Sequence, residues 1–397
     1  MALVGVVLLR LAIGLYLIGV TRSKNAASMA LRLLLETCIG VLAFWAVGRA
    51  LLTLEIGSFF DLNHTFGMEG LFTGLLLTLA CSIVTAAVME RSTLTLSITV
   101  CLLLTGLVLP LTLALCNHVF RNAVPTQIGH APGLFMAFSA VGLLTSWFVG
   151  PRTGKFNHDG SANVILGHNV PLAFAGVMLF LIAWPLVGGD FVQVGATNSL
   201  SFGSFEEIYS RIAFLTPSLQ LLAAAAAGCS GAIYSWIRYA RADVGLIFAS
   251  VLSGVVAATL LGEIWSGYAV IIGLLAGILM PMVANSIEFR LHVDDPTGLI
   301  SIFGVGAILS GLSSFLPHES AQLNQLAYSW QELEISLLIA VIPVAVMALA
   351  LIPLHALKLL RISDAAEYDG LDLADHDLNA YPDFHQSMIK SYHLREL

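Results

Sequence analysis

A pair of acidic residues before an apolar helix is the part of this sequence whose residue types could do chemistry. Asp294 and Asp295 stand directly before Pro296, and an apolar stretch rich in glycine and alanine follows. Proline fits the first turn of a helix because its missing N–H is not needed there, and carboxylates are favoured at the positive end of a helix. Small residues allow a second helix to approach closely. The pattern predicts two carboxylates at the start of a tightly packed helix, with Phe303 in its middle.

The elements that must position these residues are membrane-spanning helices. The chain of 397 residues is 58% hydrophobic and only 11% charged, and its mean hydropathy is +0.89. A soluble domain carries about 25% charged residues, so this composition excludes one. About eleven apolar runs have the roughly 20 residues that a spanning helix needs. They fall at residues 2–20, 33–54, 68–89, 95–116, 132–150, 170–189, 215–237, 243–262, 265–284, 299–316 and 334–357.

Charged residues outside the runs predict the orientation of the chain. Lysine and arginine are enriched in cytoplasmic loops. Most basic residues follow the odd-numbered runs, with Arg49, Arg121 and Arg211 as exceptions. Examples are Arg22, Arg91, Arg152, Arg238, Arg290 and Lys358. We therefore predict an N-terminus outside and a C-terminus inside. The chain divides into a transmembrane domain, residues 1–362, and an acidic cytosolic tail, residues 363–397.

One charged residue, Arg10, lies in the middle of the first apolar run, and another, Glu36, lies near the start of the second. Arg10 and Glu36 each cost at least about 2.5 kcal/mol near the membrane centre, so both should face protein or water. One interpretation is a polar pathway through the membrane. The other is a packing role, as an ion pair between helices or a group near the lipid head groups.

Several classes of function find no support in the sequence. The five cysteines fall in or beside apolar runs without metal-binding spacing, which predicts buried free thiols. There is no basic patch for nucleic acid, no nucleotide-binding loop and no catalytic set, so we expect neither an enzyme nor a cofactor.

Short motifs in a fixed order resemble the ammonium transporter family of Amt, Mep and Rhesus proteins. Each motif alone is weak, but the ordered set extends over about residues 2–382. In order, the motifs are Arg22-Ser-Lys-Asn25, Glu90-Arg91, Gly150-Pro-Arg152-Thr-Gly154, His168-Asn169, Ala183-Trp184, Asp294-Asp295-Pro296, Gly370-Leu-Asp372, His376 and Ala380-Tyr381.

The resemblance implies a fold and an assembly. It implies an all-α integral membrane protein in which the first five and the next five helices form an inverted repeat, followed by one C-terminal helix. It also implies a homotrimer with one pore per subunit. The motif residues on the cytosolic side would include Asp294, Asp295, and the tail residues Gly370, Asp372, His376 and Tyr381. The family's tail docks on the cytosolic face and helps a nitrogen-signalling protein to regulate the pore.

The resemblance also predicts where the pore should lie, and the sequence departs from the family there. The family has two hydrogen-bonded histidines inside the pore, one from the fifth helix and one from the tenth. Counting from the flanking motifs places Phe135 and Phe303 at these positions. Aromatic rings there would fill the passage and remove the hydrogen-bonding groups that a polar solute needs.

The residues expected at the outer mouth of the pore also differ from those of the family. The position of the family's outer aspartate holds the neutral Gln127, and the two aromatic gate positions fall on or near Leu76 and Val187. His118 and His130 lie near this mouth. They could act as substitute ligands, or they could simply sit at the membrane surface.

These departures leave several hypotheses for function. The first is a family member that handles ammonium or ammonia through a remodelled pore with reduced or lost conduction. The second is a non-conducting sensor or regulator that acts through its cytosolic tail, and the third is a passage for another small neutral molecule. We expect the protein in a bacterial inner (plasma) membrane.

Overall fold

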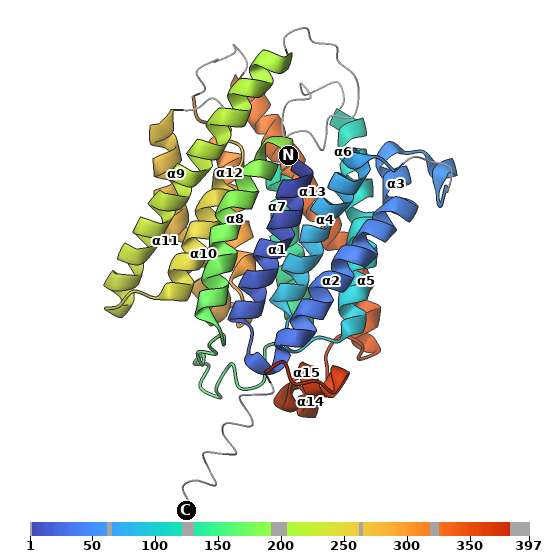
Figure 1. Cartoon of the computed structure of the whole chain (residues 1–397), viewed down its shortest axis with the longest axis vertical. Coiled ribbons are helices and arrows are strands. Elements are labelled where there is room, and N and C mark those ends of the chain that lie inside the picture. The colour runs from blue at the N-terminus through green and yellow to red at the C-terminus, as the bar shows by residue number, and fades with distance from the viewer. Residues whose placement is uncertain are drawn as a thin grey trace, which may run out of the picture.

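The protein is a bundle of helices with a short helical tail packed against one end (Figure 1). A computed structural model describes residues 2–61, 66–120, 131–191, 205–261, 265–317 and 325–381. Within these ranges nine helices are long and apolar enough to cross a membrane, and two shorter apolar helices, Val244–Ala257 and Leu299–Ser313, join them. The predicted all-α membrane fold with about eleven spans is confirmed.

The first half of the bundle contains five spans. The second span is α2 continued through residues 44–48 into α3, and the fourth is α5 continued through residues 104–108 into α6. In the fourth span a wider π-helical turn comes just before Pro110, as expected where proline removes a backbone donor. The helices are α1 (Ala2–Val20), α2 (Ala26–Ala43), α3 (Arg49–Thr53), α4 (Met68–Ala87), α5 (Leu94–Leu103), α6 (Leu109–Phe120) and α7 (Ala131–Val149).

The second half contains five spans, one further helix and the tail. Two helices, α9 and α13, start about ten residues before the predicted apolar runs, because hydropathy marks the part of a helix inside the hydrocarbon and not its ends. The helices are α8 (Val170–Phe191), α9 (Phe205–Tyr239), α10 (Val244–Ala257), α11 (Ser266–Arg290), α12 (Leu299–Ser313), α13 (Gln325–Ala356), α14 (Asp364–Asp369) and α15 (Leu371–His376).

The two halves meet through corresponding helices. The first helix of one half, α1, packs along α8, and the fifth, α7, packs along α12. Glycine makes the first contact possible: a Cβ on Gly176 of α8 would overlap the Tyr16 nitrogen and lie 2.8 Å from the Ala12 oxygen of α1. The pairing of α7 with α12 brings Phe135 and Phe303 to one place.

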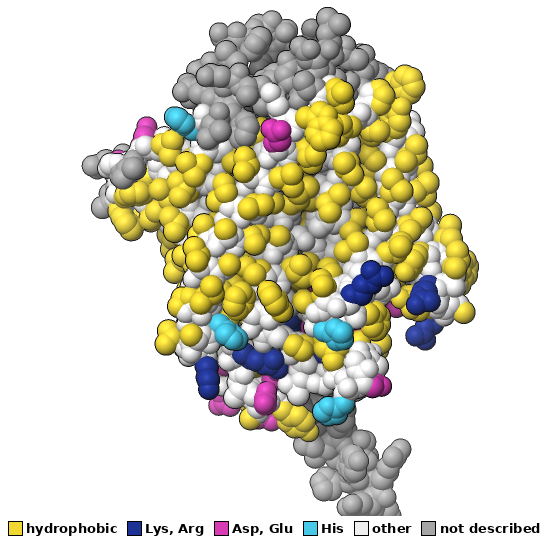
Figure 2. Space-filling model, turned by 180° about the vertical axis from the view of Figure 1, so that it is seen from behind, with side chains coloured by type: hydrophobic (Ala, Val, Ile, Leu, Met, Phe, Trp, Pro, Cys, Tyr) yellow, Lys and Arg dark blue, Asp and Glu magenta, His cyan; other side chains and the backbone are white. Residues whose placement is uncertain are grey.

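The surface matches a membrane protein. Hydrophobic side chains cover a broad belt on the face in Figure 2, and lysine and arginine side chains gather toward the end that carries the tail.

The prediction that all five cysteines are buried was wrong in part. Cys38 and Cys229 are exposed, whereas Cys81, Cys101 and Cys116 are buried. The exposed pair lies on helix faces that point out of the chain, where an apolar thiol is compatible with lipid.

Candidate functional site

Four aromatic side chains form a closed cluster where the two halves meet. Phe135 and Phe138 come from α7, Trp184 from α8 and Phe303 from α12, and each is at most 2% exposed. The Phe135 and Phe303 rings meet edge to face with centroids 5.7 Å apart. The Trp184 ring lies 5.2 Å from Phe135 and 5.9 Å from Phe303. These are the distances at which aromatic pairs attract one another beyond simple burial.

Close packing of α7 against α12 explains why these rings touch. The Ser139 hydroxyl of α7 donates to the Ile300 carbonyl of α12 at 2.7 Å. A Cβ at Gly304 would lie 2.7 Å from the Ser139 Oγ. The hydrogen bond and the absent side chain hold the helices near each other, so Phe135 and Phe303 have no space between them.

The cluster offers little to a polar solute. The Trp184 Nε1 donates to the Thr259 Oγ1 at 3.1 Å, so its polar edge already has a partner. The remaining lining from Phe135, Phe138 and Phe303 is hydrocarbon. A cation that gives up water there would gain ring faces but few acceptors, and desolvation of a charge without acceptors costs many kcal/mol.

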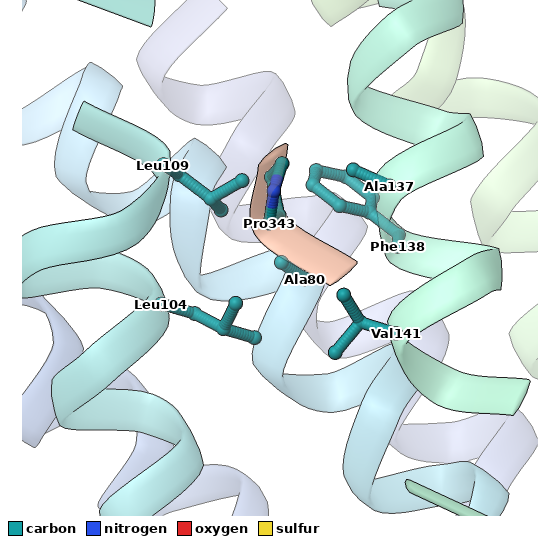
Figure 3. Close-up of a pocket in the computed structure, with 7 residues that line it drawn as sticks. All are labelled: Ala80, Leu104, Leu109, Ala137, Phe138, Val141 and Pro343. Atoms are coloured by element: carbon teal, nitrogen blue, oxygen red, sulfur yellow. The ribbon is translucent and has the colours of Figure 1, made fainter. Parts of the chain in front are cut away.

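A small gap beside the cluster is apolar too. Its lining is drawn in Figure 3, with side chains from α4, α6, α7, α13 and the wide turn of the fourth span pointing toward one another. The gap has no room for a water molecule. It is lined by Ala80, Leu104, Leu109, Ala137, Phe138, Val141 and Pro343. Empty space of this kind stays dry because a water molecule would find no polar partner.

The predicted outer-mouth residues are only partly within the described structure. Leu76 of α4 and Val187 of α8 are completely buried, and both are aliphatic where the resemblance implies aromatic gates. Gln127 and His130 lie outside the described residues. His118 lies in α6 and is exposed, in a part of the helix close to its end.

Arg10 of the first span and Glu36 of the second belong to one buried polar cluster. Arg10 donates five hydrogen bonds: two to the Thr37 hydroxyl, one to Ser82 and two to backbone carbonyls of α2 and α4. The Ser82 hydroxyl donates to the Glu36 Oε2 at 2.9 Å and so joins the two charges. Because every guanidinium N–H has an acceptor, the geometry favours the packing interpretation for Arg10.

An ion network lies at the end of the bundle that carries the tail. Arg152 holds Asp294 with Nε–Oδ2 and Nη2–Oδ1 distances of 2.8 and 3.0 Å, a two-pronged contact. Its Nη1 also lies 3.2 Å from the Glu90 Oε2, which accepts from Arg22 as well. Arg91 reaches Asp294 at 3.4 Å. These contacts join loops from both halves, and the two-pronged form gives them a fixed geometry.

The two adjacent aspartates have opposite environments. Burial would raise the pKa of Asp294, but the hydrogen bonds and charge of Arg152, with the charge of Arg91, lower it to about 2. Asp295 is half-buried, and its removal from water raises its pKa to about 6 with a smaller contribution from the Asp294 charge. The backbone N–H groups of Gly298 and Ser301 donate to Asp295 and limit the rise. Asp295 thus lies just before α12 and accepts from its first turn, as the sequence predicted. The expected place of Pro296 in that turn is wrong, because α12 begins only at Leu299.

The tail binds the start of the second span through Asp372. Its two carboxylate oxygens accept from the backbone N–H groups of Ala27 at 3.0 Å and Ser28 at 2.7 Å. These N–H groups belong to the first turn of α2, where the positive helix end favours an anion. Asp372 is 2% exposed. The tail therefore supplies the cap that α2 lacks in its own sequence.

Other tail residues extend this contact. Gly370 has a φ of 101°, and a Cβ there would lie 2.6 Å from the Lys24 oxygen, so glycine fits both the conformation and the space. The Glu367 carboxylate accepts from the Thr153 N–H at 2.7 Å and pairs with Arg361 at 2.9 Å.

The last two predicted tail residues differ in their contacts. The Tyr381 hydroxyl lies 2.6 Å from the His168 Nε2, whose ring meets the Tyr381 ring at 5.1 Å. His376 ends α15 and is half-buried. The tail thus reaches the turn before α8 as well as the start of α2.

Sequence reasoning did not identify two members of the aromatic cluster. Trp184 entered only as part of a family motif, and Phe138 was not singled out. A helical spacing of three residues between Phe135 and Phe138 was a possible signal, because residues three apart share a helix face. No signal in the sequence places Trp184 against Phe303, since these residues meet only through packing of three helices.

Helices paired across two halves, an aromatic cluster where the halves meet and a docked tail define a polytopic membrane protein fold. The profile of the Ammonium Transporter Family matches residues 1–381. The chain belongs to the ammonium transporter family.

Relatives and solved structures agree with this assignment. Amt2 of Haloferax mediterranei is 28% identical over 92% of this chain and 85% of that protein, and Amt2 of Methanocaldococcus jannaschii is 27% identical over 92% and 86%. The solved Sensor Amt Protein is 26% identical, with a TM-score of 0.81 over 95% of this chain and 96% of that one. Candida albicans Mep2, at 17% identity, has a TM-score of 0.69 over 92% and 85%. The last likeness concerns the fold alone.

Proposed function

We propose that this family member handles ammonium or ammonia in the membrane but conducts it weakly or not at all. The observation that carries the proposal is the contact between Phe135 and Phe303, with Trp184 closing the cluster. By resemblance these phenylalanines occupy the positions of the family's two histidines. The passage there is filled with hydrocarbon, which opposes any solute that must keep hydrogen bonds.

Methylammonium uptake into proteoliposomes tests this proposal. We compare the parent protein with the double variant Phe135→His, Phe303→His. An imidazole ring is smaller than a phenyl ring, and it can form hydrogen bonds with a second imidazole and with a solute. We therefore expect uptake to rise by at least about tenfold, which corresponds to an activation barrier lower by ~1.4 kcal/mol. Equal uptake by the parent and the double variant contradicts the proposal.

A matched control separates the pore from the substitution itself. Phe148 lies on the same helix, α7, near its cytosolic end, where its ring contacts His355. Phe148→His makes the same chemical change away from the cluster and should leave uptake unchanged. We also propose that the protein is a homotrimer in a bacterial plasma membrane. Native mass spectrometry of the parent and all variants checks that each forms the same oligomer.

A second candidate function is a sensor that does not conduct. Two observations favour it: the tail caps α2 through Asp372, and the Sensor Amt Protein resembles this chain at 26% identity. In this hypothesis ammonium binding alters how the tail docks on the bundle, and a cytosolic nitrogen-signalling protein binds in response to that alteration. Hydrogen exchange of residues 364–376 with and without ammonium chloride tests it. Exchange that does not respond to ammonium argues against a sensor that works through the tail.

A further inference from the structure

The helix α13 carries a buried acidic side chain that has no cationic partner among the described residues. This residue, Glu332, is in the second turn of α13 and is only 6% exposed. Its Oε1 is buried and accepts no hydrogen bond from the part of the chain that the structure describes. No lysine, arginine or histidine in the described ranges forms an ion pair with it. A carboxylate in such a place is costly unless a cation or a proton joins it.

Contacts on the same face of α13 define where this carboxylate lies. The Glu332 carboxylate faces the Ser314 hydroxyl. One turn earlier, the Ser329 hydroxyl donates to the Ser314 carbonyl at 2.7 Å. One turn later, the Ser336 backbone lies 2.8 Å from the position of a Cβ on Gly133, in the first turn of α7. Glu332 therefore lies near the end of α12 and the start of α7, at the end of the bundle away from the tail.

The surroundings of Glu332 favour positive charge. Ser314 is the residue that follows the last turn of α12, and the C-terminal end of a helix is its negative end. The Gln331 Oε1 next to Glu332 is a second buried acceptor without a hydrogen bond. Phe315 and Trp330, from the same two chain segments, meet edge to face at 5.2 Å. Acceptor oxygens and aromatic rings at one end of two helices are what a small cation needs to replace its water.

We propose that the ends of α12 and α13 away from the tail form a binding site for ammonium or a primary alkylammonium ion, with the Glu332 carboxylate as its anion. The oxygens suit an N–H donor because carboxylate and amide oxygens accept hydrogen bonds and none of them has a hydrogen to donate. A divalent metal needs about six oxygens, several of them charged, and no group of three metal-binding side chains occurs in the residues the structure describes. The proposed site does not depend on whether a solute can pass the aromatic cluster.

Ligand-dependent stability of the full chain in nanodiscs tests the site. We measure the unfolding midpoint with increasing ammonium, methylammonium or potassium chloride at constant ionic strength. Potassium matches ammonium in charge and size but has no N–H groups. We expect ammonium and methylammonium to raise the midpoint above potassium, and Glu332→Gln to weaken their apparent affinity by at least about tenfold.

The matched control is Glu334→Gln, since Glu334 is exposed on the same helix and its variant should respond as the parent does. Infrared difference spectra give a second measurement: ammonium should shift a carboxylate stretch in the parent and in Glu334→Gln, but not in Glu332→Gln. An unchanged ammonium response in Glu332→Gln, or an equal response to potassium in the parent, overturns the proposal. The two proposals are tested separately. Equal methylammonium uptake by the parent and the double variant would contradict weak conduction, but it would not affect the result of this titration.

Discussion

Neighbouring residues of one chemical type can have opposite electrostatic roles, and Asp294 and Asp295 illustrate this. Asp294 lies between Arg91 and Arg152, which stabilise its charged form. Asp295 is half-buried and accepts hydrogen bonds from backbone N–H groups and from the Thr297 hydroxyl. Charge partners outweigh burial in the first case, and burial outweighs weak hydrogen bonds in the second.

These environments predict a pH dependence of stability. With a folded pKa of about 6 against an ordinary value of 3.8, Asp295 favours the folded state most below its ordinary pKa, and this contribution is lost as pH rises toward 6. The loss is of the order of 3 kcal/mol, taking ~1.4 kcal/mol per pH unit. For Asp294 the direction is reversed: its contribution is present above pH 3.8 and is lost as pH falls toward 2.

Unfolding midpoints between pH 4 and 7 measure the Asp295 contribution. The parent should lose stability across this range relative to Asp295→Asn, which keeps the acceptor but cannot ionise. Asp369→Asn, at an exposed position, serves as the control and should follow the parent. A parallel pH profile for the parent and Asp295→Asn would refute the assignment.

At the scale of elements, backbone contact between helices decides where the halves can meet. Three glycines allow α1 to approach α8 and its preceding turn: Gly19, Gly167 and Gly176 would each place a Cβ within 2.8 Å of the partner backbone. Helices in a membrane associate mainly through such packing, because lipid is as apolar as their side chains.

A single added methyl group tests this contact. Gly176→Ala should destabilise the protein by about 1–3 kcal/mol, because the Cβ overlaps the α1 backbone, which cannot move without repacking. Gly267→Ala makes the same change in α11 at a position with open space around it, where alanine should be neutral or slightly stabilising. Thermal unfolding in detergent measures both, and equal midpoints for the two variants would show that the contact is loose.

At the scale of the whole molecule, the tail contacts a turn that lies near the start of the sequence. Asp372 binds the N–H groups of Ala27 and Ser28, almost 350 residues earlier in the chain. The Thr153 N–H and the His168 ring bind Glu367 and Tyr381. The tail thus contacts the turn after the first span and the segment between α7 and α8 that joins the two halves.

Removal of the cap should release the tail without unfolding the bundle. Asp372→Ala leaves two N–H groups of α2 without an acceptor, which costs about 1 kcal/mol. We expect faster protease cleavage within residues 364–381 in this variant, while Asp369→Ala, at an exposed position, should be cleaved like the parent. Identical cleavage rates for both variants would mean that other contacts hold the tail.

Much of the fold could be predicted because the membrane imposes local rules. A run of about 20 apolar residues must be a helix when no water can satisfy its backbone, and the loop charges predict its direction. The family motifs then identified Phe135 and Phe303 as a pair, and the structure brings their rings to 5.7 Å. Their role as pore residues stays a prediction that the uptake assay tests.

The sequence by itself determined the spans and their ends to within about ten residues. Through the family motifs it also predicts, without a test so far, that phenylalanines stand at the positions of the family's histidines. Only the tertiary structure decided which side chains share a place: Trp184 with Phe303, Ser82 between Arg10 and Glu36, and Asp372 at the start of α2. Each of these contacts joins different helices or distant segments. Hydropathy acts on one segment at a time, whereas such contacts depend on how several segments pack together.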